Sequence, residues 1–121
     1  MKNAVWFEIP ATDLDRAIKF YEEIFAKTLR RESMGGIELG VFPYEQPNTG
    51  GAVVKGPAYQ PSGDGTGPVV YVAANGEIDA ILARVPAAGG SVALPKTSIE
   101  GVGAIAHVID PEGNRVGLHA V

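Results

Sequence analysis

The chain has few side chains that could carry acid–base or metal chemistry. It contains two histidines, His107 and His119, and no cysteine. A thiolate nucleophile, a thiolate metal site and a disulfide are therefore excluded. One carboxylate, Glu8, follows Trp6 by two residues in a strand-like segment, and residues i and i+2 of a strand share one face. Glu8 and Trp6 are thus expected to point to the same side.

These groups admit more than one chemical interpretation. One carboxylate and two imidazoles form the inventory of a facial metal triad. Glu8 and His119 would alternatively form an acid–base pair, because a buried carboxylate can tune an imidazole toward neutral pH. The alternative without chemistry is that Glu8 is only a hydrogen-bonded side chain in the wall of the cup, and that His119 is an ordinary residue near the end of the sequence.

Composition excludes several classes of partner. The net charge is -4 and 45% of the residues are hydrophobic, and nothing resembles the basic footprint of a protein that binds nucleic acid or an anionic membrane surface. The longest apolar runs, such as residues 68–74, are too short to span a bilayer. Because the first residues lead directly into a strand-like segment, we expect no signal peptide and a cytoplasmic protein.

The elements that must position these side chains come in two similar sets. In the first half, residues 5–9 are rich in β-branched and aromatic side chains and predict a strand that ends at Pro10. A helix is predicted from about Asp13 to Ala26, with Thr12 as its N-cap. The apolar side chains of this helix recur at spacings of three and four residues: Leu14, Ala17, Ile18, Tyr21, Ile24 and Phe25. Three strands are predicted to follow, near residues 28–34, 37–42 and 51–55.

The second half repeats this order. An offset of 64 residues aligns Leu14 with Ile78 and brings Trp6 onto Val70. The segment Asp-Pro-Glu-Gly-Asn at 110–114 predicts the turn between the last two strands. The elements predicted here are a strand at 69–74, a helix from Glu77 through Val85, strands at 91–95, 104–109 and 115–120, and a loop that includes 96–98.

This repeat predicts an α+β fold in which two βαβββ modules form a curved mixed sheet with a cup for a ligand. We expect one domain over residues 1–121. Module one would span about 1–56, a linker rich in glycine and proline about 57–67, and module two about 68–121. One such unit cannot bury both its sheet and its helix well, whereas two packed together can.

Two motifs carry a resemblance to a known family. Residues 6–21, from Trp6-Phe7-Glu8-Ile9-Pro10 to Phe20-Tyr21, resemble the opening of the vicinal oxygen chelate superfamily. Residues 110–118 resemble its closing hairpin. That superfamily contains glyoxalases, bleomycin-resistance proteins and extradiol dioxygenases. The resemblance implies paired βαβββ modules, commonly in a homodimer, with a site inside a sheet-lined cup. It says much less about activity, because this fold hosts several chemistries.

Metal-dependent members of that superfamily take His, Gln or Glu ligands from the first and last strands of each module. By resemblance, these positions fall on Trp6, Val70 and Gly117, with the fourth near Ala52 or Val53. An indole nitrogen has no free lone pair, aliphatic side chains carry no donor and glycine has no side chain. We therefore expect no standard divalent metal site and no other cofactor.

The resemblance and this departure from it lead to one preferred hypothesis and two alternatives. In the preferred hypothesis, the protein is a homodimer that binds a small, partly apolar molecule in a metal-free cup. Trp6 would form a flat apolar wall of that cup. It would sequester that molecule or act on it by acid–base chemistry. The first alternative is a lyase similar to lactoylglutathione lyase, or a dioxygenase, that binds a metal through Glu8, His107 and His119. The second is a non-catalytic dimeric interaction protein. The predicted catalytic residues are Glu8 and His119, and the predicted ligand-binding residues are Trp6, Phe42, Val70, His107 and Gly117.

Overall fold

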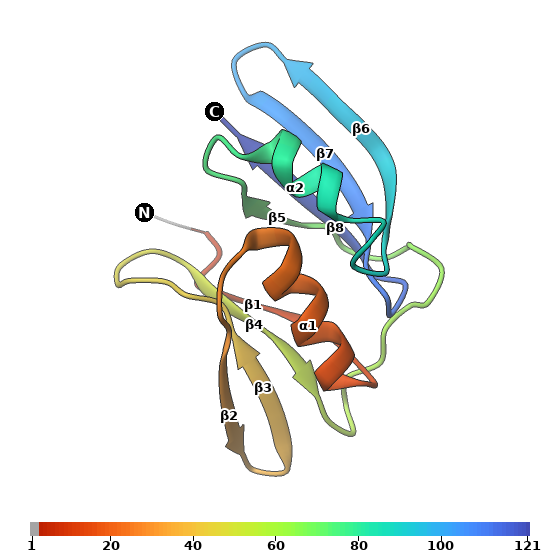
Figure 1. The fold of residues 1–121 in the computed structure, drawn as a ribbon. Helices are drawn as coiled ribbons and strands as arrows, with labels where there is room; N and C mark the ends of the chain where they lie inside the picture. The colour runs from red at the N-terminus through yellow and green to blue at the C-terminus, as the bar shows by residue number, and fades with distance from the viewer. Residues whose placement is uncertain (1–2) are drawn as a thin grey trace.

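Two four-stranded sheets, each accompanied by one helix, make up the fold (Figure 1). They are seen in a computed structural model that describes residues 3–121, so the first two residues of the predicted module one lie outside the described residues. The arrangement confirms the predicted α+β fold of two βαβββ modules. The two modules keep separate sheets rather than one continuous sheet.

Module one supplies the first sheet and the longer helix. It contains β1 (Trp6–Pro10), α1 (Leu14–Phe25), β2 (Arg30–Met34), β3 (Ile37–Val41) and β4 (Gly50–Lys55). The strand order is β1-β4-β3-β2, and β1 runs parallel to β4. Strand β1 is therefore an edge strand whose outer side is not paired within this sheet.

Module two repeats the same order. It contains β5 (Val70–Ala73), α2 (Ile78–Arg84), β6 (Ser91–Ile99), β7 (Gly103–Ile109) and β8 (Arg115–Ala120). The strand order is β5-β8-β7-β6, and β5 runs parallel to β8. Strands β1 and β5 thus occupy equivalent edge positions in the two sheets.

Helix α1 forms because its apolar side chains fall on one face and become buried. The residue that caps it is Asp13, whose carboxylate accepts a hydrogen bond of 3.1 Å from the Arg16 backbone N–H. The prediction of Thr12 as the N-cap is wrong. The hydroxyl and the backbone N–H of Thr12 both donate to Glu112 instead, which leaves the capping position to the next residue.

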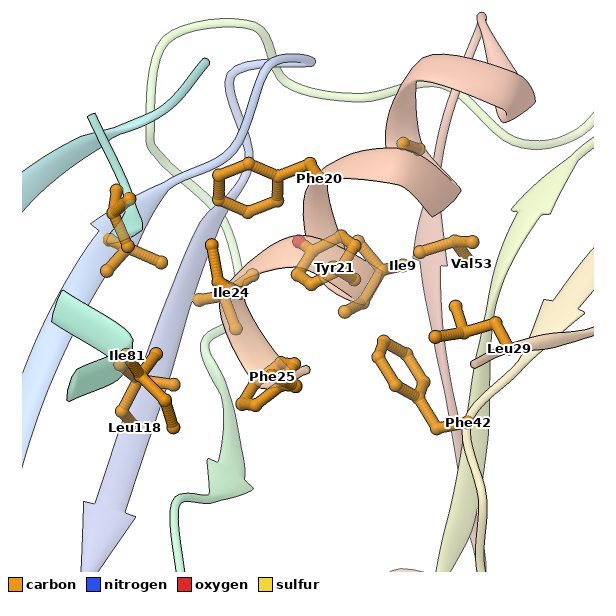
Figure 2. Packing of buried hydrophobic residues seen from close by; sticks show 14 of the residues in the cluster. Ile9, Phe20, Tyr21, Ile24, Phe25, Leu29, Phe42, Val53, Ile81 and Leu118 are labelled. Carbon is orange, nitrogen blue, oxygen red and sulfur yellow. The ribbon is translucent and has the colours of Figure 1, made fainter. Parts of the chain in front are cut away.

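The core lies where α1 packs between the two modules (Figure 2). Tyr21 and Ile24 of α1 have no solvent exposure. The same buried cluster includes Ile9 of β1 on one side, and Ile81 of α2 and Leu118 of β8 on the other. The two modules therefore share one hydrophobic core, which fixes how their sheets are placed.

A buried polar turn ties the last hairpin to the start of α1. Between β7 and β8, the side chains of Asp110, Glu112 and Asn114 are buried. The Glu112 carboxylate accepts hydrogen bonds from Thr12 and pairs with Arg16. A negative charge at this end of α1 is favourable, because the N-terminus of a helix carries a partial positive charge.

Strand β6 is longer than the sequence indicates. The prediction of a loop at residues 96–98 is wrong, because β6 continues to Ile99. Pro95 lies inside the strand, and the pairing register of β6 with β7 shifts between Leu94 and Thr97. Since β6 is an edge strand, a proline without an N–H group is tolerated at such an irregularity.

The connection between β4 and β5 is attached to the last hairpin. The Gly65 backbone N–H donates to the Gly113 carbonyl at 2.9 Å, and the Arg115 guanidinium donates to the Gly65 carbonyl at 3.0 Å. Gly113 has a φ of 87°, and a Cβ there would collide with Gly63. Glycine is thus required at this turn for both its backbone conformation and its size.

Within residues 3–121, no helix combines the length and the apolar character needed to cross a membrane.

Candidate functional site

A cavity of about 620 Å³ opens where module one faces strand β5. This volume lies within the range of roughly 300–1,000 Å³ that is common for small-molecule sites. Module one supplies one part of the cavity lining, and β5 and its flanking residues supply the other. The apolar side chains of the lining include Phe7, Phe25, Leu29 and Phe42 from module one and Val70 and Val72 from module two.

A second cavity of about 360 Å³ adjoins the first. It is lined by Ile99, Val102, Ile105 and His119, together with Tyr71 and Ala73 of β5. Tyr71 and Ala73 also line the larger cavity. Two residues of strand β5, Tyr71 and Ala73, therefore line both cavities.

The positions that the resemblance assigns to metal ligands do not suit a metal ion. The Trp6 indole N–H donates to a Glu8 carboxylate oxygen at 3.2 Å, and an indole has no lone pair to offer. At Gly117, the space that a side chain would occupy is filled by the ring of Tyr71. Ala52 is fully buried and carries no donor. A divalent ion would find no replacement for its water ligands at these positions.

The pairing of β5 with β8 fixes which face each β5 side chain occupies. Val70 pairs with Val116, and Tyr71 pairs with Gly117. Val116 belongs to the core beneath the helices, so Val70 lies on the helix side of its sheet. Tyr71 lies on the outer face, as does Trp6 in module one. In the second sheet, the residue equivalent to Trp6 is therefore Tyr71. The offset of 64 residues that aligns the two helices had indicated the preceding residue, Val70.

Trp6 and Glu8 do share the outer face of the first sheet. The Trp6 ring meets the Tyr44 ring edge-on, with 5.7 Å between their centroids. The Tyr59 hydroxyl donates to the second Glu8 oxygen at 2.8 Å, and this hydrogen bond raises the pKa of Tyr59. Both Glu8 carboxylate oxygens thus already accept hydrogen bonds from neighbouring aromatic side chains.

His119 lies in the other sheet and has a different partner. Its Nε2 atom is 2.7 Å from the Val102 carbonyl oxygen. A carbonyl only accepts, so this nitrogen carries the proton and donates. In the described part of the chain, no hydrogen bond or ion pair joins Glu8 to His119. The structure therefore does not bring the two predicted acid–base partners together.

His107 takes part in a chain of three polar side chains on the outer face of the second sheet. The Tyr71 hydroxyl oxygen lies 2.6 Å from His107 Nε2. The Arg115 guanidinium lies 3.1 Å from His107 Nδ1. Burial lowers the pKa of His107, and the positive charge of Arg115 lowers it further. His107 is thus held neutral at physiological pH.

The three candidate ligands of a relocated metal site lie apart. Glu8 is held by Trp6 and Tyr59 in the first sheet, whereas His107 and His119 have separate partners in the second. Among residues 3–121, no group of three or more His, Cys, Asp or Glu side chains is placed to hold one ion.

Phe42 belongs to an aromatic cluster rather than to the face that carries Trp6. Its ring lies 5.7 Å from that of Phe7, 5.5 Å from that of Tyr21 and 6.3 Å from that of Phe25. Figure 2 shows Phe42 beside Leu29 at the module-one side of the core. Because Phe42 also lines the larger cavity, together with Phe7 and Phe25, it combines a packing role with a place in the cavity wall.

Arg115 is a site residue that the sequence did not reveal. The sequence did contain one indication, because the spacing of Arg115, Gly117 and His119 by two residues along a strand places them on one face. Without the pairing of β7 with β8, however, His107 could not be placed on that same face. The pairs His107–Gly117 and Ile105–His119 bring it there.

Comparisons with known proteins agree with this fold. The family model described as Glyoxalase/Bleomycin resistance protein/Dioxygenase superfamily matches residues 3–118. Two curated relatives, from Mycobacterium bovis and Mycobacterium tuberculosis, both bear the name CFP32 and are named as candidate glyoxylases. Each is 30% identical over 117 residues, which cover 93% of this chain and 43% of the relative. The chain thus spans less than half the length of these relatives.

Solved structures show the same architecture. Glyoxalase I from Zea mays superposes with a TM-score of 0.70 at 24% identity, covering 96% of this chain and 43% of the maize chain. Glyoxalase I from Leishmania major gives 0.71 at 21% identity, covering 98% and 86%. A glyoxalase/bleomycin resistance protein from Streptomyces sp. CB03234 gives 0.70 at 24% identity, covering 98% and 100%. At such identities the likeness concerns the fold alone.

Proposed function

Because the chain belongs to the glyoxalase/bleomycin resistance protein/dioxygenase superfamily, we propose that it binds a small, partly apolar organic molecule between its two modules without the usual divalent metal. Its place in the cell would be the cytoplasm. The bound molecule is either sequestered or acted on by the polar side chains of the cavity walls.

The observation that carries this proposal is the cavity of about 620 Å³ beside β5. Aromatic and aliphatic walls favour an apolar ligand, because burying apolar surface is favourable by about 25 cal/mol per Å². Polar groups at the rim would orient that ligand, as is common in small-molecule sites. Lys27, Thr49, Asn75 and the two tyrosines Tyr44 and Tyr71 supply such groups.

The alternative of a metal-dependent lyase or dioxygenase finds less support. The family ligand positions carry Trp6 and Gly117, which supply no donor atom to a metal. The substitutes Glu8, His107 and His119 each have other hydrogen-bond partners. We therefore propose chemistry based on shape and hydrogen bonding rather than on a Lewis acid.

A cavity-filling variant tests the proposal. Val70 is half-buried in the wall of the larger cavity, so Val70→Phe would occupy part of its volume. Val92→Phe is the matched control, since Val92 is exposed on β6 and lines neither cavity. Binding is followed with N-phenyl-1-naphthylamine, a neutral aromatic dye whose fluorescence rises in apolar surroundings.

The wild-type protein and Val92→Phe should bind the dye equally, and Val70→Phe should bind it at least about tenfold more weakly, a loss of about 1.4 kcal/mol. Treatment with EDTA should leave all three affinities unchanged. Equal binding by Val70→Phe and Val92→Phe, or loss of dye binding in EDTA, would contradict the proposal.

We also propose that the protein forms a homodimer. Large apolar side chains are exposed on the outer face of the second sheet and in its β6–β7 turn, among them Ile99 and Val102. A second copy seated over this face would cover them and close the open side of the smaller cavity. Val102→Glu should then shift the sedimentation coefficient from that of a dimer to that of a monomer. A wild-type protein that sediments as a monomer would contradict the proposed homodimer.

A further inference from the structure

Three polar side chains on the outer face of the second sheet form an ordered chain of hydrogen bonds. Arg115 contacts His107 Nδ1, and His107 Nε2 contacts the Tyr71 hydroxyl. The Arg115 guanidinium is itself anchored, because its Nε–H donates to the Gly65 carbonyl. The guanidinium is therefore held in place at one end of this series of hydrogen bonds, and the Tyr71 hydroxyl lies at the other end.

The direction of each hydrogen bond follows from the chemistry of arginine. A guanidinium only donates and does not lose its proton in proteins, so His107 Nδ1 must accept with its lone pair. A neutral imidazole carries one proton, which then resides on Nε2. The His107 Nε2–H donates to the Tyr71 oxygen at 2.6 Å. The hydroxyl proton of Tyr71 is thus left free for another acceptor.

Tyr71 lies beside accessible space. The Tyr71 side chain is 46% exposed, and it lines both cavities. Ile99, Val102 and Ile105 give the smaller cavity apolar walls beside it. A hydroxyl donor beside apolar walls selects a ligand that joins an apolar body to an oxygen acceptor.

The charge of this face favours an acceptor rather than a cation. The outer-face side chains of β5, β7 and β8 follow from the strand register. Across these three described strands they include one arginine and two histidines but no carboxylate: Tyr71, Ala73, Ile105, His107, Ile109, Arg115 and His119. A hydrogen bond that is polarised by a nearby positive charge is stronger than a neutral one.

We propose that Arg115, His107 and Tyr71 act as a polarised donor relay, in which the Tyr71 hydroxyl binds a carbonyl or carboxylate oxygen of the ligand. Tyr71 is the contact residue, and His107 and Arg115 are positioning residues that fix its proton outward. This inference rests on the proposed ligand cavity and names the class of molecule that the cavity takes: a small apolar or aromatic compound with a carbonyl or carboxylate group.

The first experiment reads the His107 proton directly and needs no ligand. Nitrogen-15 NMR of the labelled protein distinguishes a protonated from an unprotonated ring nitrogen, and His119→Gln identifies the His107 signals. The wild-type protein should show the Nε2–H tautomer. Arg115→Leu should give a mixture of tautomers, because Nδ1 then loses its donor.

Two results would overturn the relay. An Nδ1–H tautomer in the wild-type protein would abolish the hydrogen bond with Arg115, because both groups would then be donors, and would make the Tyr71 hydroxyl donate its proton to Nε2. An unchanged tautomer in Arg115→Leu would show that arginine does not set it. If Arg115→Leu fails to fold, Arg115→Met, which keeps an unbranched stem but no donor, serves in its place and should likewise give a mixture of tautomers.

The second experiment tests the ligand class with three probes that share a phenyl ring. Benzoate carries a carboxylate, acetophenone a carbonyl, and ethylbenzene no acceptor at all. Tyr71→Phe should weaken binding of the acceptor-bearing probes by about tenfold, the effect expected for one hydrogen bond, and should leave the third unchanged. Loss with benzoate alone would assign the site to carboxylates, and loss with acetophenone alone to carbonyls.

Failure of the relay and failure of the cavity are distinguishable. If Tyr71→Phe binds benzoate and acetophenone as tightly as the wild-type protein while N-phenyl-1-naphthylamine still binds, the relay is wrong and the cavity stands. If the dye binding is insensitive to Val70→Phe, the proposed cavity is wrong, whereas the His107 tautomer still reports on the relay.

Discussion

At the residue scale, the most constrained charge is the carboxylate of Glu112. Its side chain has no solvent exposure. Burial alone would raise its pKa, but hydrogen bonds from the Thr12 backbone, Arg16 and the Thr12 hydroxyl outweigh that effect and lower the pKa below its ordinary value. Arg16, for its part, is bound by Glu112, and its own pKa is raised. The pair thus links the last hairpin to the first helix.

Glu112→Gln should lower the free energy of unfolding by about 2 kcal/mol, because the buried hydrogen bonds then lose their charged acceptor. Since the folded state lowers the pKa of Glu112, this stabilisation is complete above the unfolded pKa and is lost as pH falls through the folded pKa. Urea titrations between neutral pH and the acidic range should show a shallower loss of stability in Glu112→Gln. Parallel pH profiles of both proteins would contradict this role.

Tyr21 and Tyr59 form a natural pair for measuring the effect of burial. The Tyr21 hydroxyl donates to the buried Asp110 carboxylate at 2.6 Å, whereas Tyr59 donates to the exposed Glu8 at 2.8 Å. Tyr21→Phe should cost about 1.5–3 kcal/mol of unfolding free energy. Tyr59→Phe should change it by less than about 0.5 kcal/mol. Equal effects would show that burial does not decide the strength of these bonds.

The sequence could not reveal these interactions at the residue scale. The segment 110–114 predicts a turn from its proline and glycine, and the turn is present. Its second role, binding the residues just before a helix about a hundred residues earlier in the chain, depends on tertiary placement alone. Glu112 was therefore missed because nothing in its neighbours in sequence distinguishes a buried carboxylate from an exposed one.

At the scale of elements, the predictions succeeded where periodicity was strong. The helix predicted at about 13–26 is α1 (Leu14–Phe25), and the last predicted strand has the bounds of β8. The prediction for β6 stopped at Pro95, because proline normally ends a strand; an edge position removes that constraint. The face of Val70 was out of reach, since a shift of one residue along a strand exchanges its two faces.

Two glycines show how closely other side chains approach the strands. A Cβ at Gly51 would collide with the Phe7 ring, and one at Gly117 with the Tyr71 ring. Phe7 packs against the core, so Gly51→Ala should cost about 1–3 kcal/mol of unfolding free energy. Tyr71 is exposed and can rotate away, so Gly117→Ala should cost less but should move the nitrogen-15 signals of His107. The reverse order of stability losses would contradict this packing.

At the scale of the whole molecule, the shared core places the two modules so that a cavity remains beside β5. The fold itself was predictable, because two motifs at the start and the end of the chain are typical of this superfamily. The cavity was not, because its walls come from residues far apart in sequence, such as Phe7 and Val72. Their approach depends on how α1 packs between the sheets.

The central proposal is that this cavity works without the family's metal ion, because the positions that the resemblance assigns to ligands carry Trp6 and Gly117. Elemental analysis of the protein, produced with zinc, nickel, cobalt and manganese in the medium and purified without chelator, tests it most directly. The account predicts far less than one metal ion per chain. One ion per chain, released by Glu8→Ala or His119→Ala, would contradict it.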